Sequence, residues 1–179
     1  MVRAFIALEL SGAVKDQLKD AQEALRGSSA RLTFVVPEII HITVKFLGEV
    51  SEKDLLRVQE LLKEIPFSPF PVTAGIVTVN NPKRPHTVWC RINDEGKGEM
   101  LCRFIEDRLE PLGFGRETRR FTPHATIARV KVHDPSLFFA LQLLRVREYG
   151  RCMITGMKLK KSTLTPAGPL YEDLAEVVW

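Results

Sequence analysis

Cysteine is scarce in this chain, and its spacing offers no framework for disulfides or for a zinc site. The cysteines are Cys90, Cys102 and Cys152, so any disulfide scheme leaves at least one of them unpaired. The sequence contains no Cys-x-x-Cys pair. We therefore expect reduced thiols and a cytoplasmic location.

Long apolar runs are also missing, which argues against a membrane protein. The apolar N-terminus contains Arg3 and Glu9 and is too short for a signal peptide, so we interpret it as a strand. No segment approaches the length of a membrane span. The chain of 179 residues is 45% hydrophobic and 27% charged, which is typical of one ordinary globular domain. Its net charge of +4 permits a polyanionic partner without demanding one.

Several signatures of cofactor chemistry are missing as well. The sequence has neither a Walker-type glycine loop nor a dinucleotide-binding pattern. It has no His-x-His or His-Glu-x-x-His, and short local spacings of that kind are common in zinc sites. No local signature marks a serine or cysteine nucleophile. We expect neither a metal nor an organic cofactor.

Apolar periodicity and turn residues predict a mixture of helices and strands. Helices are expected at 12–26 and 52–65, with Ser11 and Ser51 as their N-caps, and at 97–112 and 135–144. Strands are expected at 2–10, 32–36, 40–47, 72–79, 87–92, 124–132, 152–164 and 170–178. Prolines at 66, 69 and 71 indicate a linker. The mixed order with hairpin-length loops favours an α+β fold over a regular parallel array.

A strand-like motif occurs twice in the chain. Residues 41–47, His-Ile-Thr-Val-Lys-Phe-Leu, are echoed by residues 124–130, His-Ala-Thr-Ile-Ala-Arg-Val. The two copies use two of only four histidines, and they start 83 residues apart, at positions 41 and 124, close to half the chain length. We interpret this as an internal duplication, in which each half of a single domain (residues 1–179) contributes one histidine.

The repeated motif suits phosphoryl chemistry. In a strand, side chains two apart share a face, so His41 and Thr43 lie together, as do His124 and Thr126. If the two strands are neighbours, one imidazole can take a proton from a nucleophile while the other gives one to the leaving oxygen. The two hydroxyls can donate hydrogen bonds to the non-bridging oxygens. A single His-x-Thr is common in proteins, so the prediction rests on the duplication.

Basic and aromatic residues near the motifs are candidates for contacts to RNA. Strict alternation places Lys45 on the face of His41, where it could neutralise phosphate, although a solvated lysine would fit equally well. Arg119 and Arg120 form a basic cluster with Arg116 just before the second motif, and it could hold an RNA backbone or be an ordinary solvated loop. Phe121 beside them could stack on a base or belong to the core.

The flanking residues extend the pattern into a family resemblance. His41-x-Thr43 leading into Phe-Leu-Gly, and Phe121-x-Pro-His-x-Thr-Ile-Ala-Arg129, resemble the paired signatures of the two-histidine phosphoesterases. The chain is most similar to the RNA 2′,3′-cyclic phosphodiesterases, historically called 2′-5′ RNA ligases. The resemblance runs from Arg-Ala-Phe-Ile-Ala at residues 3–7 to the segment ending at Tyr171.

The resemblance implies a bilobal fold in which two pseudo-symmetric antiparallel sheets flank a central cleft, with helices outside. It implies metal-independent hydrolysis of an RNA 2′,3′-cyclic phosphate to a 2′-phosphomonoester, and reversible 2′-5′ joining of RNA such as tRNA halves. By analogy His41 is the proton donor and His124 the proton acceptor, in a monomer. Arg129 matches an arginine that often follows the second motif, and Tyr171 is expected near the cleft.

Arg129 poses a geometric problem, because strict alternation from His124 puts it on the opposite face. The Arg129 side chain can contact phosphate only if the strand ends or bulges before it, or if its length lets it bend around the strand. Two rival functions also remain open. One is another reaction of the superfamily, cleavage of nucleotide cyclic phosphates or of 2′-5′ oligonucleotides. The other is a non-catalytic RNA-binding module whose histidines only contact phosphate.

Overall fold

A computed structural model describes residues 1–145, 147–166 and 168–179 of the chain. The strands in these residues are β1 (Val2–Glu9), β2 (Arg31–Phe34), β3 (His41–Val50), β4 (Phe70–Val79), β5 (Thr87–Asn93), β6 (His124–Val132), β7 (Arg151–Ile154), β8 (Gly156–Thr165) and β9 (Gly168–Val178). The helices are α1 (Gly12–Leu25), α2 (Glu52–Lys63), α3 (Lys97–Leu109) and α4 (Ser136–Leu144), with 3₁₀ turns at Pro37–Ile39 and Glu110–Leu112. The predicted α+β class is confirmed.

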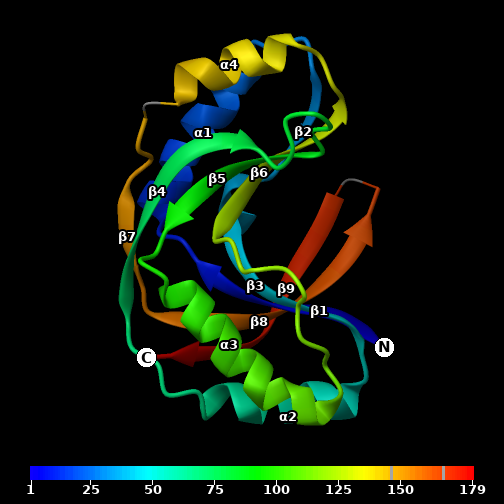
Figure 1. Ribbon diagram of the computed structural model, residues 1–179. Helices are drawn as coiled ribbons and strands as arrows, with labels where there is room; N and C mark the ends of the chain where they lie inside the picture. Colours follow the sequence, from blue (N-terminus) through cyan, green and yellow to red (C-terminus); the bar gives the residue numbers. More distant parts are fainter. Residues whose placement is uncertain (146, 167) are drawn as a thin grey trace.

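The strands form one curled antiparallel sheet that narrows at its centre (Figure 1). Its order is β7-β4-β5-β6-β3-β1-β8-β9, and β2 pairs with β6. The two central strands, β3 and β6, share a single backbone pairing, Ile42 with Ala125. We call β3, β1, β8 and β9 the first lobe and β6, β5, β4, β7 and β2 the second lobe. The two sheets implied by the resemblance are therefore joined through this narrow connection.

The chain exchanges elements between the lobes. Helix α1 lies between β1 and β2 in sequence, yet it contacts β6 and α4, whereas α3 contacts β3 and α2. Strand β4 follows α2 but pairs with β5, and β8 returns to pair with β1. Figure 1 shows α1 and α4 over the second lobe and α2 and α3 over the first. Neither half of the sequence therefore forms a lobe by itself.

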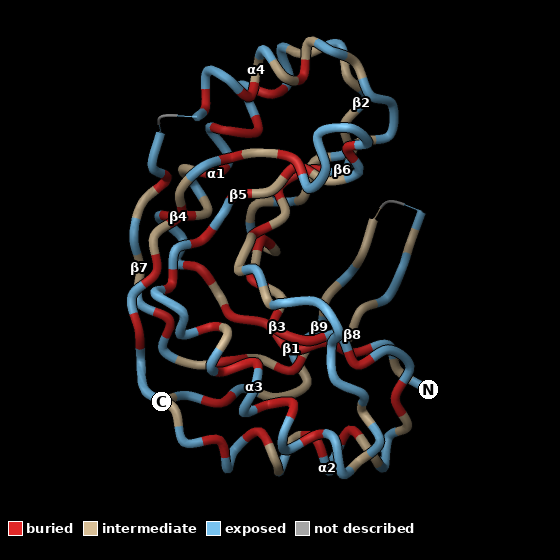
Figure 2. Tube along the Cα trace, viewed as in Figure 1, coloured by how far each residue is buried: buried red, intermediate tan, exposed pale blue. Residues whose placement is uncertain are grey.

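The helices form where their caps and apolar faces were expected. The Ser11 hydroxyl accepts a hydrogen bond from the Val14 backbone N–H, and the Ser51 hydroxyl does the same for Asp54. The buried face of α1 contains Val14, Leu18, Ala21 and Leu25. These faces pack on one side of the sheet, where buried residues concentrate (Figure 2). The opposite side, which the helices leave uncovered, we call the inner face.

One predicted strand is wrong: the segment 152–164 forms two strands that belong to different lobes. β7 pairs with β4 in the second lobe, and β8 pairs with β1 in the first, with the change of lobe at Thr155. The apolar pattern is continuous through this segment, so it does not indicate where the chain passes from one lobe to the other. The predicted proline linker is also too long, because Pro71 lies in β4 at a position whose backbone pairing is with Met153 of β7.

The start of β8 requires glycine. A Cβ atom on Gly156 would collide with the backbone carbonyl oxygen of Val177 in β9. We expect Gly156→Ala to lower the free energy of unfolding by about 1–3 kcal/mol, because the two strands must separate to admit the methyl group. Urea unfolding followed by circular dichroism measures this change. The control is Gly12→Ala, where a Cβ meets nothing and the helix gains propensity; equal stability of the two variants would contradict the prediction.

Candidate active site

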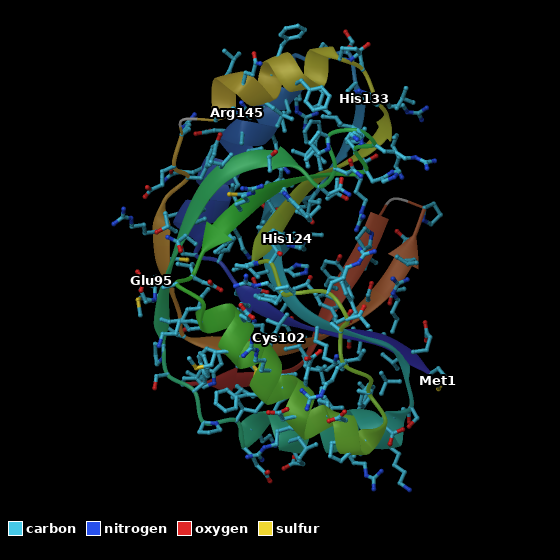
Figure 3. The ribbon with its side chains drawn as sticks, in the orientation of Figure 1. Met1, Glu95, Cys102, His124, His133 and Arg145 are labelled. Atoms are coloured by element: carbon cyan, nitrogen blue, oxygen red, sulfur yellow. The ribbon has the colours of Figure 1, made fainter. Side chains whose placement is uncertain are left out.

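The two motif strands meet at the narrow centre of the sheet. Because Ile42 pairs with Ala125 in an antiparallel sense, His41 lies toward Thr126 and Thr43 toward His124. Ile42 and Ala125 are buried on the helix side, whereas the two histidines and two threonines are half-buried on the inner face. Figure 3 shows His124 at the start of β6, where the two lobes adjoin. The structure thus brings together the four motif residues that the sequence predicted.

Both imidazoles are oriented in the same way. His41 Nδ1 lies 2.8 Å from the Ile39 carbonyl oxygen, and His124 Nδ1 lies 2.7 Å from that of Thr122. A carbonyl oxygen only accepts, so Nδ1 carries the hydrogen in each ring. Nε2 is then the ring nitrogen that carries no hydrogen in the neutral ring, so it is the one able to accept a proton. In His41, Nε2 lies 3.1 Å from the Thr43 hydroxyl.

Burial lowers the pKa of both histidines. For His41 the effect of burial is opposed by the Ile39 hydrogen bond and by the negative charge of Glu9, while Lys160 and Lys15 lower the pKa further. For His124 the effect of burial is opposed by the Thr122 hydrogen bond, and no carboxylate contributes. The neutral imidazole is therefore favoured in both rings, and His41 alone of the two has a carboxylate helping it to hold a proton.

Aromatic rings pack against each histidine. Phe5 stacks on His41 with 5.0 Å between ring centroids, and the Tyr171 ring meets His41 edge-on at 5.4 Å. Trp89 of β5 lies 4.1 Å from the His124 ring. No local sequence pattern indicates the place of Trp89 beside His124. The register, which pairs Trp89 with Thr126, was the missing information.

A bulge occurs at the same place in both motif strands and changes which side chains reach the inner face. Val44 and Lys45 are both buried, as are Ile127 and Ala128, so strict alternation fails after each threonine. The register shifts at these points, between β1 and β3 and between β5 and β6. As a result Arg129 is exposed on the face of His124 and Thr126. The bulge supplies the geometry that Arg129 needed.

Arg129 and Tyr171 approach each other from different lobes. Burial raises the pKa of the Tyr171 hydroxyl, and the positive charge of Arg129 lowers it. Arg3 and Lys160 act on that hydroxyl in the same direction. The inner face near the two histidines therefore combines a guanidinium from β6 with a phenol from β9.

The placement predicted for Lys45 is wrong. The bulge turns its side chain to the helix side, where it is 3% exposed and forms an ion pair of 3.1 Å with Glu106 of α3. Lys45 Nζ also donates to the Gly115 carbonyl oxygen at 2.8 Å, while Glu106 accepts from the Glu117 backbone N–H. These bonds hold the loop that leads to the second motif, and they leave Lys45 unable to contact RNA.

The basic cluster before the second motif is largely neutralised. Arg120 pairs with Glu99 at 3.0 Å, and Arg116 pairs with Asp107 and Glu110, all three acids being on or next to α3. Within the described residues only Arg119 of this cluster has no acidic partner. The Phe121 ring lies against Gly98 in α3 and packs on the core. The predicted RNA contacts of Arg120 and Phe121 therefore meet competing interactions within the protein.

Two further observations bear on cofactors and membranes. Among residues 1–145, 147–166 and 168–179, no three His, Cys, Asp or Glu side chains gather in a geometry suited to a metal ion. Within the same residues, no helix has the length and apolar character needed to cross a membrane.

Comparison with known proteins places this chain in a family. Residues 8–89 match the family model described as LigT like Phosphoesterase. The RNA 2′,3′-cyclic phosphodiesterase of Archaeoglobus fulgidus is 34% identical over 174 residues, which cover 97% of this chain and 98% of that protein. The chain belongs to the LigT-like phosphoesterase family. The RNA 2′,3′-cyclic phosphodiesterase of Methanothermobacter thermautotrophicus is 32% identical over 178 residues, which cover 97% of this chain and 96% of that protein.

Solved structures share the fold of this chain. The Thermus thermophilus protein TT0787 superposes with a TM-score of 0.80 at 26% identity, covering 98% of this chain and 97% of its own. Escherichia coli LigT in its apo form gives a TM-score of 0.78 at 19% identity, with 99% and 96% covered. The curled antiparallel sheet with four helices is thus the architecture of LigT-like phosphoesterases.

The buried ion pair gives a prediction about the motif strand. We expect Lys45→Met to lower the free energy of unfolding by about 3 kcal/mol, because it leaves the Glu106 carboxylate buried without its partner. Adding Glu106→Gln should recover part of that loss, since the neutral amide costs less to bury. Chemical denaturation of the single and double variants measures both effects. A variant of unchanged stability whose KM for RNA rises would instead restore Lys45 as an RNA contact.

Proposed function

We propose that this protein hydrolyses the 2′,3′-cyclic phosphate at an RNA end to a 2′-phosphomonoester. The observation that carries the proposal is the pair of imidazoles on adjoining strands, each with Nδ1 bound to a carbonyl oxygen and Nε2 left to exchange protons. A site of this kind supplies one acid and one base at the same phosphorus. The curated names of the Archaeoglobus and Methanothermobacter relatives support RNA 2′,3′-cyclic phosphate as the substrate.

The proposed reaction needs only these side chains and water. His124 Nε2 takes a proton from water as the water oxygen attacks phosphorus. The P–O3′ bond breaks, and His41 Nε2 gives its proton to O3′, which leaves the phosphate on O2′. Thr43, Thr126 and Arg129 hydrogen-bond to the non-bridging oxygens, whose negative charge increases in the transition state. The hydroxyl of Tyr171 lies on the same face as a further donor.

The family resemblance assigns the acid to His41 and the base to His124, and one feature of the surroundings of the two rings supports this assignment. Glu9 stands opposite His41 in the β1–β3 register, and its charge raises the pKa of His41. No carboxylate does this for His124. A general acid must carry its proton before the reaction, and the charge of Glu9 favours that form of His41, while Lys160 and Lys15 oppose it. In the reverse direction the roles exchange, so the same site would join RNA ends, such as tRNA halves, through a 2′-5′ bond.

The proposal also states that the enzyme needs no metal ion, that it is a monomer and that it is located in the cytoplasm. It also includes the origin of the single domain, residues 1–179, from a duplicated unit. The repeated His-x-Thr and the bulge that follows each threonine support the duplication.

The test of the reaction is product analysis. We expect the wild-type protein, in excess EDTA, to convert an RNA with a 2′,3′-cyclic phosphate end into the 2′-monoester alone. His41→Ala and His124→Ala should each lower turnover by about 10²–10⁴-fold, because each removes one proton transfer. Chromatography against 2′- and 3′-phosphate standards identifies the product.

Each other outcome points to a different function. Turnover of mononucleotide cyclic phosphates or 2′-5′ oligonucleotides, without turnover of RNA ends, would assign another two-histidine reaction. RNA affinity with no turnover of any substrate would assign a binding module. Activity lost in EDTA and restored by zinc or manganese would refute metal independence.

The pH dependence tests the roles of the histidines. Burial lowers the pKa of both rings below the usual value near 6.5, so kcat/KM should be bell-shaped with its maximum below about pH 6.5. The acid limb reports His124, which must be neutral, and the alkaline limb reports His41, which must be charged. Glu9→Gln removes a negative charge beside His41, so it should move the alkaline limb to lower pH. A shift of the acid limb instead would reverse the assignment.

A further inference from the structure

The two lobes differ in how their surface cations are compensated. In the first lobe, the lysines of β8 are paired with acids of β9 and β1. Lys160 contacts Glu9 and Asp173, each at 2.7 Å, and Lys158 contacts Asp173 at 2.6 Å. Lys161 contacts Glu172 at 3.1 Å. These ion pairs compensate the lysines of β8, and exposed Arg3 of β1, whose charge acts on the Tyr171 hydroxyl, remains without an ion pair among the described residues.

The second lobe carries a group of cations without such partners. Within the described part of the chain, the ion pairs include none made by Arg31, Lys83, Arg84, Arg129 or Lys131, and all five residues are exposed. We call these five residues the basic edge. The acid next to it in sequence, Asp134, is occupied by the N–H and hydroxyl of Ser136 at the start of α4.

Backbone pairing brings the segments of the basic edge together. Arg129 pairs with Thr33 of β2 and with Thr87 of β5. Arg31 pairs with Val132, and the Val130 N–H donates to the His86 carbonyl oxygen at 2.9 Å. The loop with Lys83 and Arg84 ends at His86, so it adjoins the far end of β6 (Figure 1). The basic edge thus starts at Arg129 in the active site and continues away from both histidines.

We propose that the basic edge binds the phosphodiester backbone of the RNA strand that leads to the cyclic end. This inference rests on the proposed function and adds the direction in which the RNA leaves the site, across the second lobe. Unpaired guanidinium and ammonium groups bind successive phosphates and release the counterions of the nucleic acid. The paired lysines of the first lobe would have to break an ion pair to do the same.

The test compares long and short substrates. The variant Lys83→Gln, Arg84→Gln, Lys131→Gln leaves Arg129 in place. Its control is Lys19→Gln, Lys53→Gln, Lys97→Gln, which removes the same charge from exposed residues of α1, α2 and α3 that also form no ion pair within the described residues. Thermal unfolding by circular dichroism verifies that both variants fold.

For an RNA of about ten nucleotides with a cyclic phosphate end, we expect the edge variant to lose about tenfold or more in kcat/KM at low salt, and the control less than about twofold. The slope of log affinity against log salt should fall by about 2 when three phosphate contacts are removed. Turnover of a mononucleotide 2′,3′-cyclic phosphate should not change, because it has no strand to bind.

Equal losses in the edge and control variants, or an equal loss on the mononucleotide, would overturn the proposal. A measurement of RNA binding tests the basic edge separately from the proposed catalytic function. Fluorescence anisotropy of labelled RNA, measured with His41→Ala and His124→Ala added to every protein, reports the edge without turnover. If the wild-type protein hydrolyses neither substrate, the proposed function fails, while the anisotropy still accepts or rejects the edge.

Discussion

The backbone pairing of Ile42 with Ala125 is the constraint on which the site depends. It is the one register position shared by β3 and β6, and it sets each histidine toward the threonine of the other motif. The side chains of this pair point into the two lobes' cores, so the same residues that hold the lobes together leave the inner face to polar groups. The helices lie on the outer side, so they do not cover the imidazoles, against which aromatic rings pack.

The bulge that follows each threonine turns a different kind of side chain to the inner face in each lobe. After His124 it turns Arg129 to the inner face, and after His41 it turns Phe46 to that face and Lys45 into the helix layer. Two strands with a bulge at the same place thus present a cation in one lobe and an aromatic ring in the other. The backbone repeat positions the two histidines, and the differing side chains make the two sides of the site unlike.

Much of this architecture could be predicted from the sequence. The caps Ser11 and Ser51, the apolar helix faces and the His-x-Thr pairs are local signals, and the structure has each of them where it was expected. The errors came from long-range interactions. Lys45 left its expected face because of a bulge. Two contacts also lay beyond local patterns: the ion pair of Arg120 with Glu99, and the packing of Trp89 on His124, which depends on the strand register. The passage of the chain from one lobe to the other at Thr155 likewise depends on the tertiary fold, so a local sequence pattern does not predict it.

The exchange of elements between the lobes has a consequence for biosynthesis. Strand β1 pairs with β3, which follows soon after it, but its other edge pairs Ala4 with Lys161 of β8. During translation that edge therefore stays unpaired until nearly the whole chain has left the ribosome. Contacts between such distant residues slow folding, and an unpaired strand edge is prone to join other chains. The first lobe is thus the last to close, because the second edge of β1 is covered only when β8 of the C-terminal hairpin pairs with it.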